Sequence, residues 1–313
     1  MTLTSTTIPN ITQHQVAAYL TKRPKDSHKG MFGTVAVIGG ASGMVGAALL
    51  AGRAALKTGA GCVHVGLLAD NAPSVDSVQP ELMLHSASDI MSSAPFVLSP
   101  SPPFALSLSK ERTGLRAGLS MGDPVLAVGC GLGTSLAARN LLETALQSNA
   151  SLVLDADALN LLAAHPDLQS LLTARKTPTV LTPHPGEAAR LLSSTTADIQ
   201  KDRITSVQRL AKVFACSVVL KGAYSLCSTN DGLFVNETGN PGMSAPGMGD
   251  VLTGMIAAFL AQGLRADHAL LLAVHLHGAA GDEMARLGIS VGMTASELTD
   301  QARLILNRWV SRL

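Results

Sequence analysis

Asn240-Pro-Gly-Met-Ser-Ala-Pro-Gly-Met-Gly-Asp250, which runs into the apolar segment 251–260, constrains the fold and function of this chain more than any other stretch. It is a glycine-rich turn that places one carboxylate, Asp250, at the start of an apolar helix. Glycines let the backbone approach a ligand closely, and the first turn of a helix offers unbonded N–H groups and a positive dipole end. Because a carboxylate there can act as a base beside a bound phosphate, the stretch predicts phosphoryl transfer to a hydroxyl group.

Short apolar strands alternate with helical segments along most of the chain. Strands are expected at residues 34–38, 62–68, 125–128, 152–154, 179–181 and 218–220. Continuous apolar runs of this length, separated by helices, predict a mainly parallel sheet covered on both faces. Residues 224–228 and 232–235 predict an antiparallel hairpin at the edge of that sheet.

The end of the chain carries a clear helix signal. Thr294-Ala-Ser-Glu297 predicts a capping box that opens a C-terminal helix over about 294–312. The Pro- and Ser-rich stretch 92–109 is expected to be a loop, because α/β units flank it on both sides. The expected fold is therefore α/β, with a single domain over residues 1–313.

Glycine-rich or polar turns follow five of the predicted strands. They are Gly39-Gly40, Gly129–Gly133, Asp155–Asp157, Pro183–Glu187 and Lys221-Gly222. In open parallel sheets, ligands bind outside the carboxyl ends of the strands, so these turns are expected to surround a ligand. Gly129-Cys-Gly-Leu-Gly133 lacks the G-x-G-x-x-G spacing of a dinucleotide fingerprint, and it fits either close backbone approach to a ligand or a structural tight turn.

Several polar side chains lie at this predicted edge. His184 stands between two prolines and is expected to contact a ligand. Asp155 and Asp157 fit equally well the positioning of a substrate or a Mg²⁺-bound water and the capping of a helix. Lys221 fits a nucleotide contact or an exposed edge lysine. His275 and His277, two residues apart on an apolar helix, do not share a face, so packing is favoured over metal binding.

Gly247-Met-Gly-Asp250 resembles the G-x-G-D anion-hole motif of the ribokinase-like superfamily, and Asn236–Met243 resembles the ADP/ATP-dependent NAD(P)H-hydrate dehydratases. Further blocks are similar to that family in the same order: Gly39-Gly40, Gly131–Gly133, Leu154–Asn160, Thr182–Glu187, Lys221–Ala223 and His277–Asp282. The similarity covers about residues 29–285. It implies a ribokinase-like three-layer α/β/α fold around a central, mainly parallel sheet.

The resemblance implies dehydration of the S-epimer of hydrated NADH or NADPH with ADP as co-substrate, Mg²⁺ as cofactor, and AMP and phosphate as products. Asp250 would deprotonate the C6 hydroxyl of the substrate, which attacks the β-phosphate of ADP, while the N–H groups of an anion hole stabilise the developing charge. By the family pattern the residue roles are: anion hole, Gly247, Met248 and Gly249; substrate contacts, Ala47, Gly133, His184 and Asp250; nucleotide contacts, Lys221, Gly222, Ala223, Tyr224, Ser225 and Gly249. No residue is assigned as a metal ligand.

The family pattern also implies a homo-oligomer, a tetramer, and a separate epimerase, because only about 30 residues precede the first predicted strand. Pro246 and Met248 depart from the pattern, which usually has Gly and then Ser or Thr there. Pro246 has no N–H to donate, so the anion hole would depend on the three residues after it. Two alternatives follow: a hydroxyethylthiazole or hydroxymethylpyrimidine kinase of the same fold, and a nucleotide-binding sensor or scaffold that has lost catalysis.

Composition agrees with an enzyme that acts on small molecules. Of the 313 residues, 47% are hydrophobic and only 14% are charged, which favours a large core or an oligomer interface. The net charge of +1 argues against a nucleic-acid partner. The four cysteines show no C-x-x-C spacing and are expected to be buried, reduced thiols. The N-terminus has no signal-peptide pattern, and no apolar run is long enough to span a membrane, so a cytoplasmic location is expected.

Overall fold

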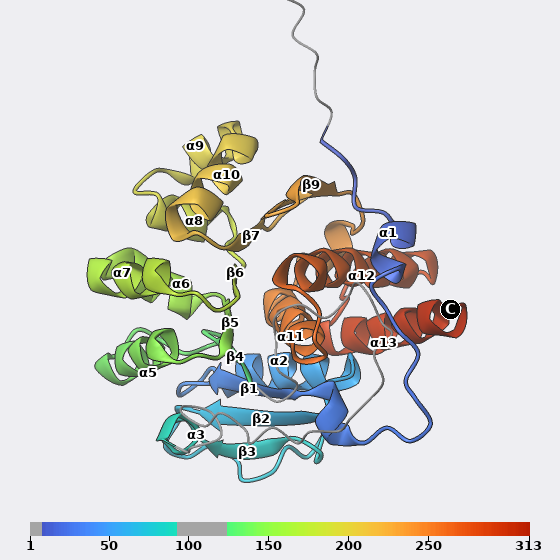
Figure 1. Ribbon diagram of the computed structural model, residues 1–313, viewed down its shortest axis with the longest axis horizontal. Coiled ribbons are helices and arrows are strands. Elements are labelled where there is room, and N and C mark those ends of the chain that lie inside the picture. The colour runs from blue at the N-terminus through green and yellow to red at the C-terminus, as the bar shows by residue number, and fades with distance from the viewer. Residues whose placement is uncertain (1–7, 93–123) are drawn as a thin grey trace, which may run out of the picture.

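A computed structural model describes residues 8–92 and 124–313 of the chain. Its centre is a nine-stranded sheet in the order β3-β2-β1-β4-β5-β6-β7-β8-β9 (Figure 1). The strands are β1 Thr34–Gly39, β2 Cys62–Leu67, β3 Met83–Ser86, β4 Val125–Val128, β5 Ser151–Leu154, β6 Thr179–Leu181, β7 Ser217–Leu220, β8 Ser225–Thr229 and β9 Gly232–Asn236. In this order the first seven strands, from β3 through β7, pair in parallel, whereas β8 pairs antiparallel with both β7 and β9. The predicted mainly parallel sheet and its edge hairpin are confirmed.

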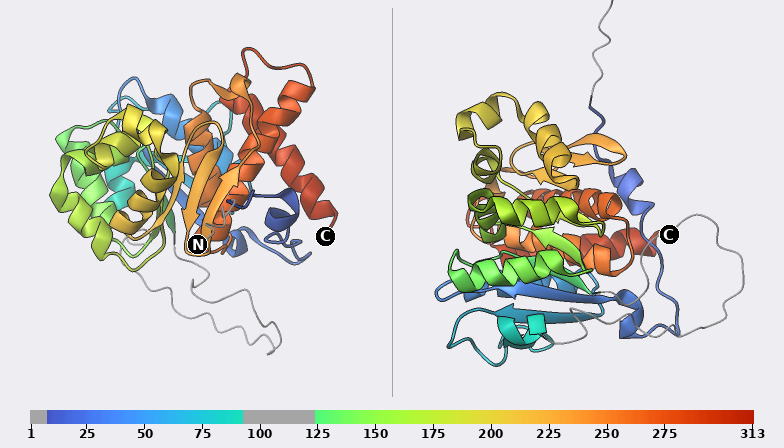
Figure 2. Two further views of the ribbon diagram at one scale, coloured as in Figure 1. Left: turned by 90° about the horizontal axis from the view of Figure 1, so that it is seen from above. Right: turned by 60° about the vertical axis from the view of Figure 1, so that its left-hand side comes forward.

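Helices cover both faces of the sheet (Figures 1 and 2). On one face lie α2 Val45–Lys57, α11 Met248–Ala261, α12 Ala266–Arg286 and α13 Ala295–Ser311. On the other lie α3 Ala87–Ser92, α5 Leu136–Gln147, α6 Asp157–Ala164, α7 Pro166–Ala174, α8 Pro185–Leu191 and α10 Arg203–Phe214. Shorter elements are α1 Gln13–Ala17, α9 Thr196–Lys201 and two 3₁₀ turns, η1 Lys29–Phe32 and η2 Pro241–Met243. The three-layer α/β/α architecture is as predicted.

Alternation along the strands explains the two cores. Val35 and Val37 of β1 pack with the helices of the first face, whereas Ala36 and Ile38 pack with those of the second. All four side chains are completely buried. Successive side chains of a strand point to opposite faces, so a fully apolar run is stable only when both faces are covered.

Local signals fixed several boundaries correctly. The predicted capping box opens α13: the Thr294 hydroxyl accepts a hydrogen bond from the Glu297 N–H, and the Glu297 carboxylate accepts one from the Thr294 N–H. Strand β3 was not predicted, because Met83–Ser86 is short and half of it is exposed at the sheet edge. The predicted loop over 92–109 lies outside the described residues except for Ser92, which ends α3.

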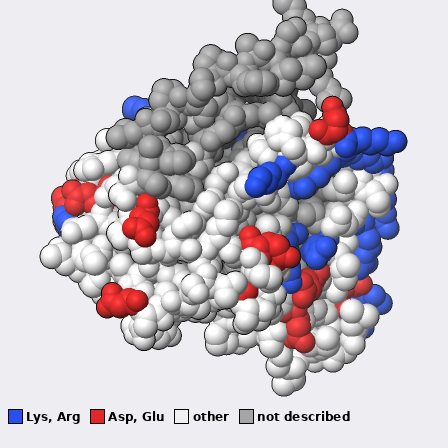
Figure 3. Space-filling model, turned by 90° about the horizontal axis from the view of Figure 1, so that it is seen from below, with Lys and Arg blue, Asp and Glu red and all other residues white. Residues whose placement is uncertain are grey.

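The cysteines and the surface bear on the remaining predictions. All four cysteines are free; Cys130 and Cys227 are buried as predicted, while Cys62 and Cys216 are half-buried. Acidic and basic side chains both occur on the face shown in Figure 3. Among the helices of residues 8–92 and 124–313, none is both long and apolar enough to cross a bilayer.

Candidate functional site

The five predicted turns meet at one edge of the sheet, because they follow the adjacent strands β1, β4, β5, β6 and β7. Two of them are bonded directly to each other: the N–H of Gly40 donates to the carbonyl of Cys130 at 3.1 Å, and that of Ala41 donates to Gly131 at 2.7 Å. A Cβ at Gly39 would collide with the Cys130 carbonyl. The glycines here are therefore required for contact between the two turns.

The turn after β4 is also held by Asp157, the first residue of α6. A carboxylate oxygen of Asp157 accepts a hydrogen bond from the Gly133 N–H at 2.8 Å, and Gly133 has a φ of 72°. Gly131 (φ 61°) packs beside Ala47 of α2, whose Cβ would lie 3.1 Å from a side chain at that position. The predicted substrate residues Ala47 and Gly133 thus border one continuous turn, and their contact with substrate stays a prediction.

Asp250 lies in the first turn of α11. The helix is preceded by Gly247 in the left-handed region at φ 86°, and a Cβ there would crowd Leu50. The first helical hydrogen bond runs from the Val251 N–H to the Gly247 carbonyl at 3.0 Å, so the N–H groups of Met248, Gly249 and Asp250 precede the helical ladder. The Met248 side chain is 6% exposed and packs in the core. Methionine in place of the Ser or Thr of the family pattern therefore changes the core packing but leaves the backbone N–H groups of this turn unchanged.

Asp155, at the end of β5, forms the centre of a buried ionic network. The Lys221 ammonium lies 2.6 Å from one carboxylate oxygen, and the Thr253 hydroxyl donates to the other at 2.9 Å. Burial opposes ionisation of Asp155, but Lys221 and the hydroxyls of Thr182 and Thr253 outweigh it and lower its pKa. Burial likewise disfavours the Lys221 ammonium, yet Asp155 and Glu187 raise its pKa. The pair is therefore charged at neutral pH.

The environment of Asp250 is different. Burial raises the pKa of Asp250 to about 6, and the negative charge of Asp155 adds to the effect. A hydrogen bond with Cys130 and the charge of Lys221 act in the opposite direction. A carboxyl group with such a pKa is poised between its acid and base forms near neutral pH, which suits a general base.

Lys221 also lies beside the start of α11. A Cβ added to Gly249 would be 3.3 Å from the Lys221 ammonium, so the lysine charge and the unbonded N–H groups are adjacent. Together with the positive end of the helix dipole, they form a site that favours an anion. The sequence placed Lys221 at this edge but did not predict its pairing with Asp155.

His277, on α12, contacts the same helix start. Its Nε2 lies 3.0 Å from the Met248 carbonyl, and burial lowers its pKa to about 4. The ring is thus neutral, and its Nε2–H donates to the carbonyl, which orients the first peptide of α11. His275 is buried and its ring approaches Trp309, with centroids 6.0 Å apart. The two histidine side chains therefore make separate contacts.

His184 caps α8. Its Nδ1 accepts hydrogen bonds from the N–H groups of Gly186 and Glu187 at 3.0 and 3.4 Å, while its side chain remains 50% exposed. Nε2 lies 3.2 Å from a Glu187 carboxylate oxygen, and the other oxygen of Glu187 is 3.8 Å from Lys221. His184 therefore has a structural capping role, and its predicted ligand contact stays a prediction.

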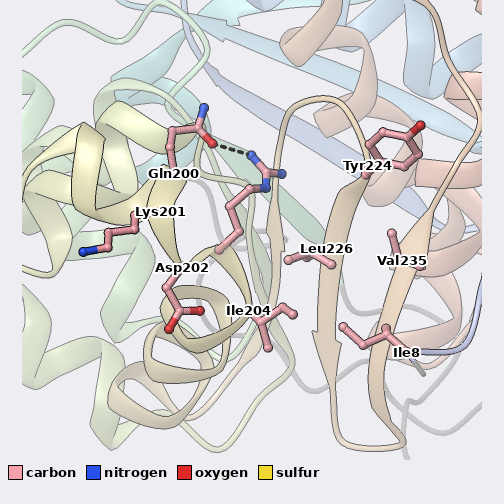
Figure 4. Close-up of a pocket in the computed structure, with 9 residues that line it drawn as sticks. Ile8, Gln200, Lys201, Asp202, Ile204, Tyr224, Leu226 and Val235 are labelled. Atoms are coloured by element: carbon pink, nitrogen blue, oxygen red, sulfur yellow. Dashed lines mark hydrogen bonds between the residues drawn. The ribbon is translucent and has the colours of Figure 1, made fainter. Parts of the chain in front are cut away.

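The predicted nucleotide loop, residues 221–225, contains backbone at positive φ and is held by hydrogen bonds from Arg203. Gly222 has a φ of 133° and Tyr224, with an exposed ring, a φ of 54°. Arg203 donates to the carbonyls of Leu220 and Lys221 at 3.2 and 3.4 Å. Behind this loop lies a cavity of about 370 Å³, lined by Ile8, Gln200, Lys201, Asp202, Arg203, Ile204, Tyr224, Leu226 and Val235 (Figure 4).

The segment 236–243 packs closely on α12. A Cβ at Gly278 would collide with Thr238, and one at Gly281 would collide with Met243. Asp282 accepts hydrogen bonds from the Gly239 N–H at 2.9 Å and the Asn240 side chain at 3.2 Å. The two glycines and the aspartate of α12 thus hold the loop that leads into the anion-binding turn.

Donor atoms of Cys130, Asp155 and Asp250 lie within 4.8 Å of one another. A thiol is a poor ligand for Mg²⁺, and both oxygens of Asp155 are already engaged. This cluster does not fit a dedicated Mg²⁺ site.

Comparisons with known proteins converge on one family. The family model described as NAD(P)H-hydrate dehydratase matches residues 35–303. The chain is 40% identical over 291 residues to the ADP-dependent (S)-NAD(P)H-hydrate dehydratase of Neisseria meningitidis serogroup B, covering 91% of this chain and 89% of the relative. It is 35% identical to the bifunctional NAD(P)H-hydrate repair enzyme of Escherichia coli over 96% of this chain, but it spans only 53% of that relative.

Solved structures support the same relationship. The ADP/ATP-dependent NAD(P)H-hydrate dehydratase from Bacillus subtilis, co-crystallised with ATP/Mg²⁺, superposes with a TM-score of 0.77 at 28% identity, covering 97% of this chain and 100% of that chain. A hydroxyethylthiazole kinase from Pyrococcus horikoshii has a TM-score of 0.57 at 15% identity over 90% of this chain and 91% of its own, which shows a shared fold alone.

Proposed function

The chain belongs to the NAD(P)H-hydrate dehydratase family, and we propose that it converts the S-epimer of hydrated NADH or NADPH back to the reduced cofactor with ADP as co-substrate. The observation that carries the proposal is the raised pKa of Asp250, about 6, at a helix start where free N–H groups adjoin the Lys221 ammonium. A base and an anion site within one helical turn are the two requirements of phosphoryl transfer to a hydroxyl.

The proposed reaction begins with proton transfer. Ionised Asp250 accepts the proton of the substrate's C6 hydroxyl, and the oxygen attacks the β-phosphorus of ADP. The bond from that phosphorus to the bridging oxygen breaks, and AMP leaves. The N–H groups of Gly247, Met248 and Gly249 stabilise the charge that develops on the transferred group. The C6–O bond of this phosphate ester then breaks, inorganic phosphate leaves with the electron pair of that bond, and loss of a proton from the neighbouring ring carbon restores the double bond.

The nucleotide and substrate lie, in this proposal, on opposite sides of Asp250. Residues Lys221, Gly222, Ala223, Tyr224 and Ser225 contact the adenine nucleotide together with Gly249, whereas Ala47, Gly133 and His184 contact the hydrated cofactor. Arg203 supports the first loop through its bonds to the carbonyls of Leu220 and Lys221. The phosphate oxygens of the nucleotide would hold Mg²⁺, which would neutralise part of the phosphate charge.

The kinase alternative is less well supported. It would use the same base and anion site but would need a different substrate region. The segment 236–243, held on α12 by Asp282, lies within the residues that match the dehydratase family model, whereas the hydroxyethylthiazole kinase of Pyrococcus horikoshii shares the fold alone. A sensor without activity would have no use for a carboxyl group whose pKa is set near neutrality.

The direct test is recovery of reduced-nicotinamide absorbance when the protein is incubated with hydrated NADH and Mg²⁺, with ADP and ATP in parallel samples. We expect recovery in both samples, faster with ADP. Absence of recovery with either nucleotide, together with phosphorylation of a hydroxyethylthiazole or hydroxymethylpyrimidine, would establish the kinase instead.

We further propose that the protein acts as one catalytic domain in a cytoplasmic homotetramer and that a separate epimerase supplies the S-epimer. Free thiols on all four cysteines and the low fraction of charged residues support a reducing compartment and subunit association. Light scattering that gives a monomer at micromolar concentration would contradict the oligomer.

A further inference from the structure

Cys130 is a fully buried thiol at the centre of the candidate site. Its Sγ lies within 4.8 Å of carboxylate oxygens of both Asp155 and Asp250. The backbone of the residue is fixed, because its carbonyl accepts the Gly40 N–H at 3.1 Å and Gly39 leaves no space between the two turns. The thiol therefore has a defined position beneath the base.

The surroundings of Cys130 determine its protonation state. Burial raises the pKa of the thiol well above its ordinary value, and the charges of Asp250 and Asp155 raise it further. The group is thus a neutral S–H, able to donate one hydrogen bond. One oxygen of Asp155 already accepts a bond from Lys221 and the other accepts one from Thr253, so the Asp250 carboxylate, also within 4.8 Å of the thiol, is the better placed acceptor.

We propose that the Cys130 thiol is a positioning residue for the reaction: it donates a hydrogen bond to one oxygen of Asp250 and so directs the other oxygen to the substrate hydroxyl. The proposal rests on the proposed function in taking Asp250 as the base. A donor to the ionised form also stabilises that form, so Cys130 and Asp155 act on Asp250 in opposite directions.

Cys130→Ala tests this against a matched control, Cys227→Ala. Cys227 is equally buried, on β8 of the same sheet, so the same atoms are lost from a well-packed site away from Asp250. We expect Cys130→Ala to move the acid limb of the kcat–pH profile upward by about half a unit to one unit, the size of one lost hydrogen bond. Cys227→Ala should leave the limb in place, and Cys130→Ser, which keeps a donor, should restore it. Equal limbs in all three variants and wild type would overturn the proposal.

Infrared spectroscopy gives a readout that needs no turnover. The wild-type-minus-Cys130→Ala difference spectrum isolates the S–H stretch of Cys130, and the matching spectrum with Cys227→Ala isolates that of Cys227. We expect the Cys130 band at the lower frequency, and we expect it to rise when Asp250→Ala removes the acceptor. An S–H stretching frequency of Cys130 that is unchanged by Asp250→Ala would overturn the proposed hydrogen bond. If the S–H band of Cys130 has the lower frequency of a hydrogen-bonded thiol but the protein shows no dehydratase turnover, the proposed function would be disproved while the hydrogen bond would be confirmed.

Discussion

The end of β5 and the start of α11 each present one aspartate, and the two side chains have opposite properties. Asp155 faces a lysine and two hydroxyls, which lower its pKa despite complete burial. Asp250, within 4.8 Å of it, has the raised pKa of about 6. The comparison shows that the hydrogen-bond donors and charges around a carboxylate, and not its burial alone, decide whether its pKa is lowered, as for Asp155, or raised, as for Asp250.

Replacing Asp250, the proposed base, should have the largest effect on kcat. Asp250→Asn keeps the shape of the side chain but cannot accept the substrate proton, so we expect kcat to fall by about 10²- to 10⁴-fold. Nucleotide binding should persist, because the N–H groups of α11 and Lys221 are unchanged. Steady-state kinetics and calorimetric ADP titration measure the two quantities. Turnover at the wild-type rate would remove Asp250 from the mechanism.

Replacing Asp155 should shift the pKa of Asp250 without removing the Asp250 carboxylate. The negative charge of Asp155 raises the pKa of Asp250, so Asp155→Asn should move the acid limb of kcat, near pH 6 in the wild type, downward by about one unit or more. Activity requires ionised Asp250, so the variant should keep a larger share of its own maximal rate at pH 5. The variant should also be less stable, because Lys221 loses its buried partner.

A limb that stays at the wild-type position in Asp155→Asn would show that the two carboxylates are not coupled. Chemical unfolding of the same variant separates the stability effect from the shift. Asp157→Asn, which alters a carboxylate bound to the Gly133 N–H, serves as a second charge-neutralising control, with a smaller expected shift.

The two histidines of α12 offer the smallest and most specific comparison. His277 donates to the Met248 carbonyl at the anion site, so His277→Phe should raise KM for ADP by about tenfold, the value of one hydrogen bond. Within residues 8–92 and 124–313, the buried Nδ1 of His275 has no hydrogen-bond partner, so His275→Phe should leave KM unchanged. Equal KM values for both variants would refute the positioning role of His277.

Eight of the nine strands, all but β3, and the turns that follow them were predicted correctly because their signals are local. Gly247–Asp250 is a contiguous motif, and each turn directly follows its strand. The pairing of Lys221 with Asp155 joins residues 66 positions apart, and the contact of Thr253 with Asp155 spans 98. Spacing along the chain does not encode such contacts, so the origin of the Asp250 pKa became visible only in the folded structure.

Cys130 illustrates the same limit. In the sequence it lies between Gly129 and Gly131, and it was predicted only to be a buried, reduced thiol. The fold places its sulfur beside the carboxylates of Asp155 and Asp250, which follow Cys130 in the chain by 25 and 120 residues. Met248 shows the converse, because in the sequence it departs from the family pattern inside the anion-hole motif, whereas the structure places its side chain in the core.

Product stoichiometry tests the central claim most directly. Hydrated NADH and ADP should be incubated with the protein, and NADH, AMP and inorganic phosphate should be quantified in the same sample. We predict equal amounts of all three products from the wild type, and none from Asp250→Asn over the same period. AMP or phosphate formed without NADH, or a phosphorylated nicotinamide product that accumulates unchanged, would contradict the assignment of the chain as a dehydratase.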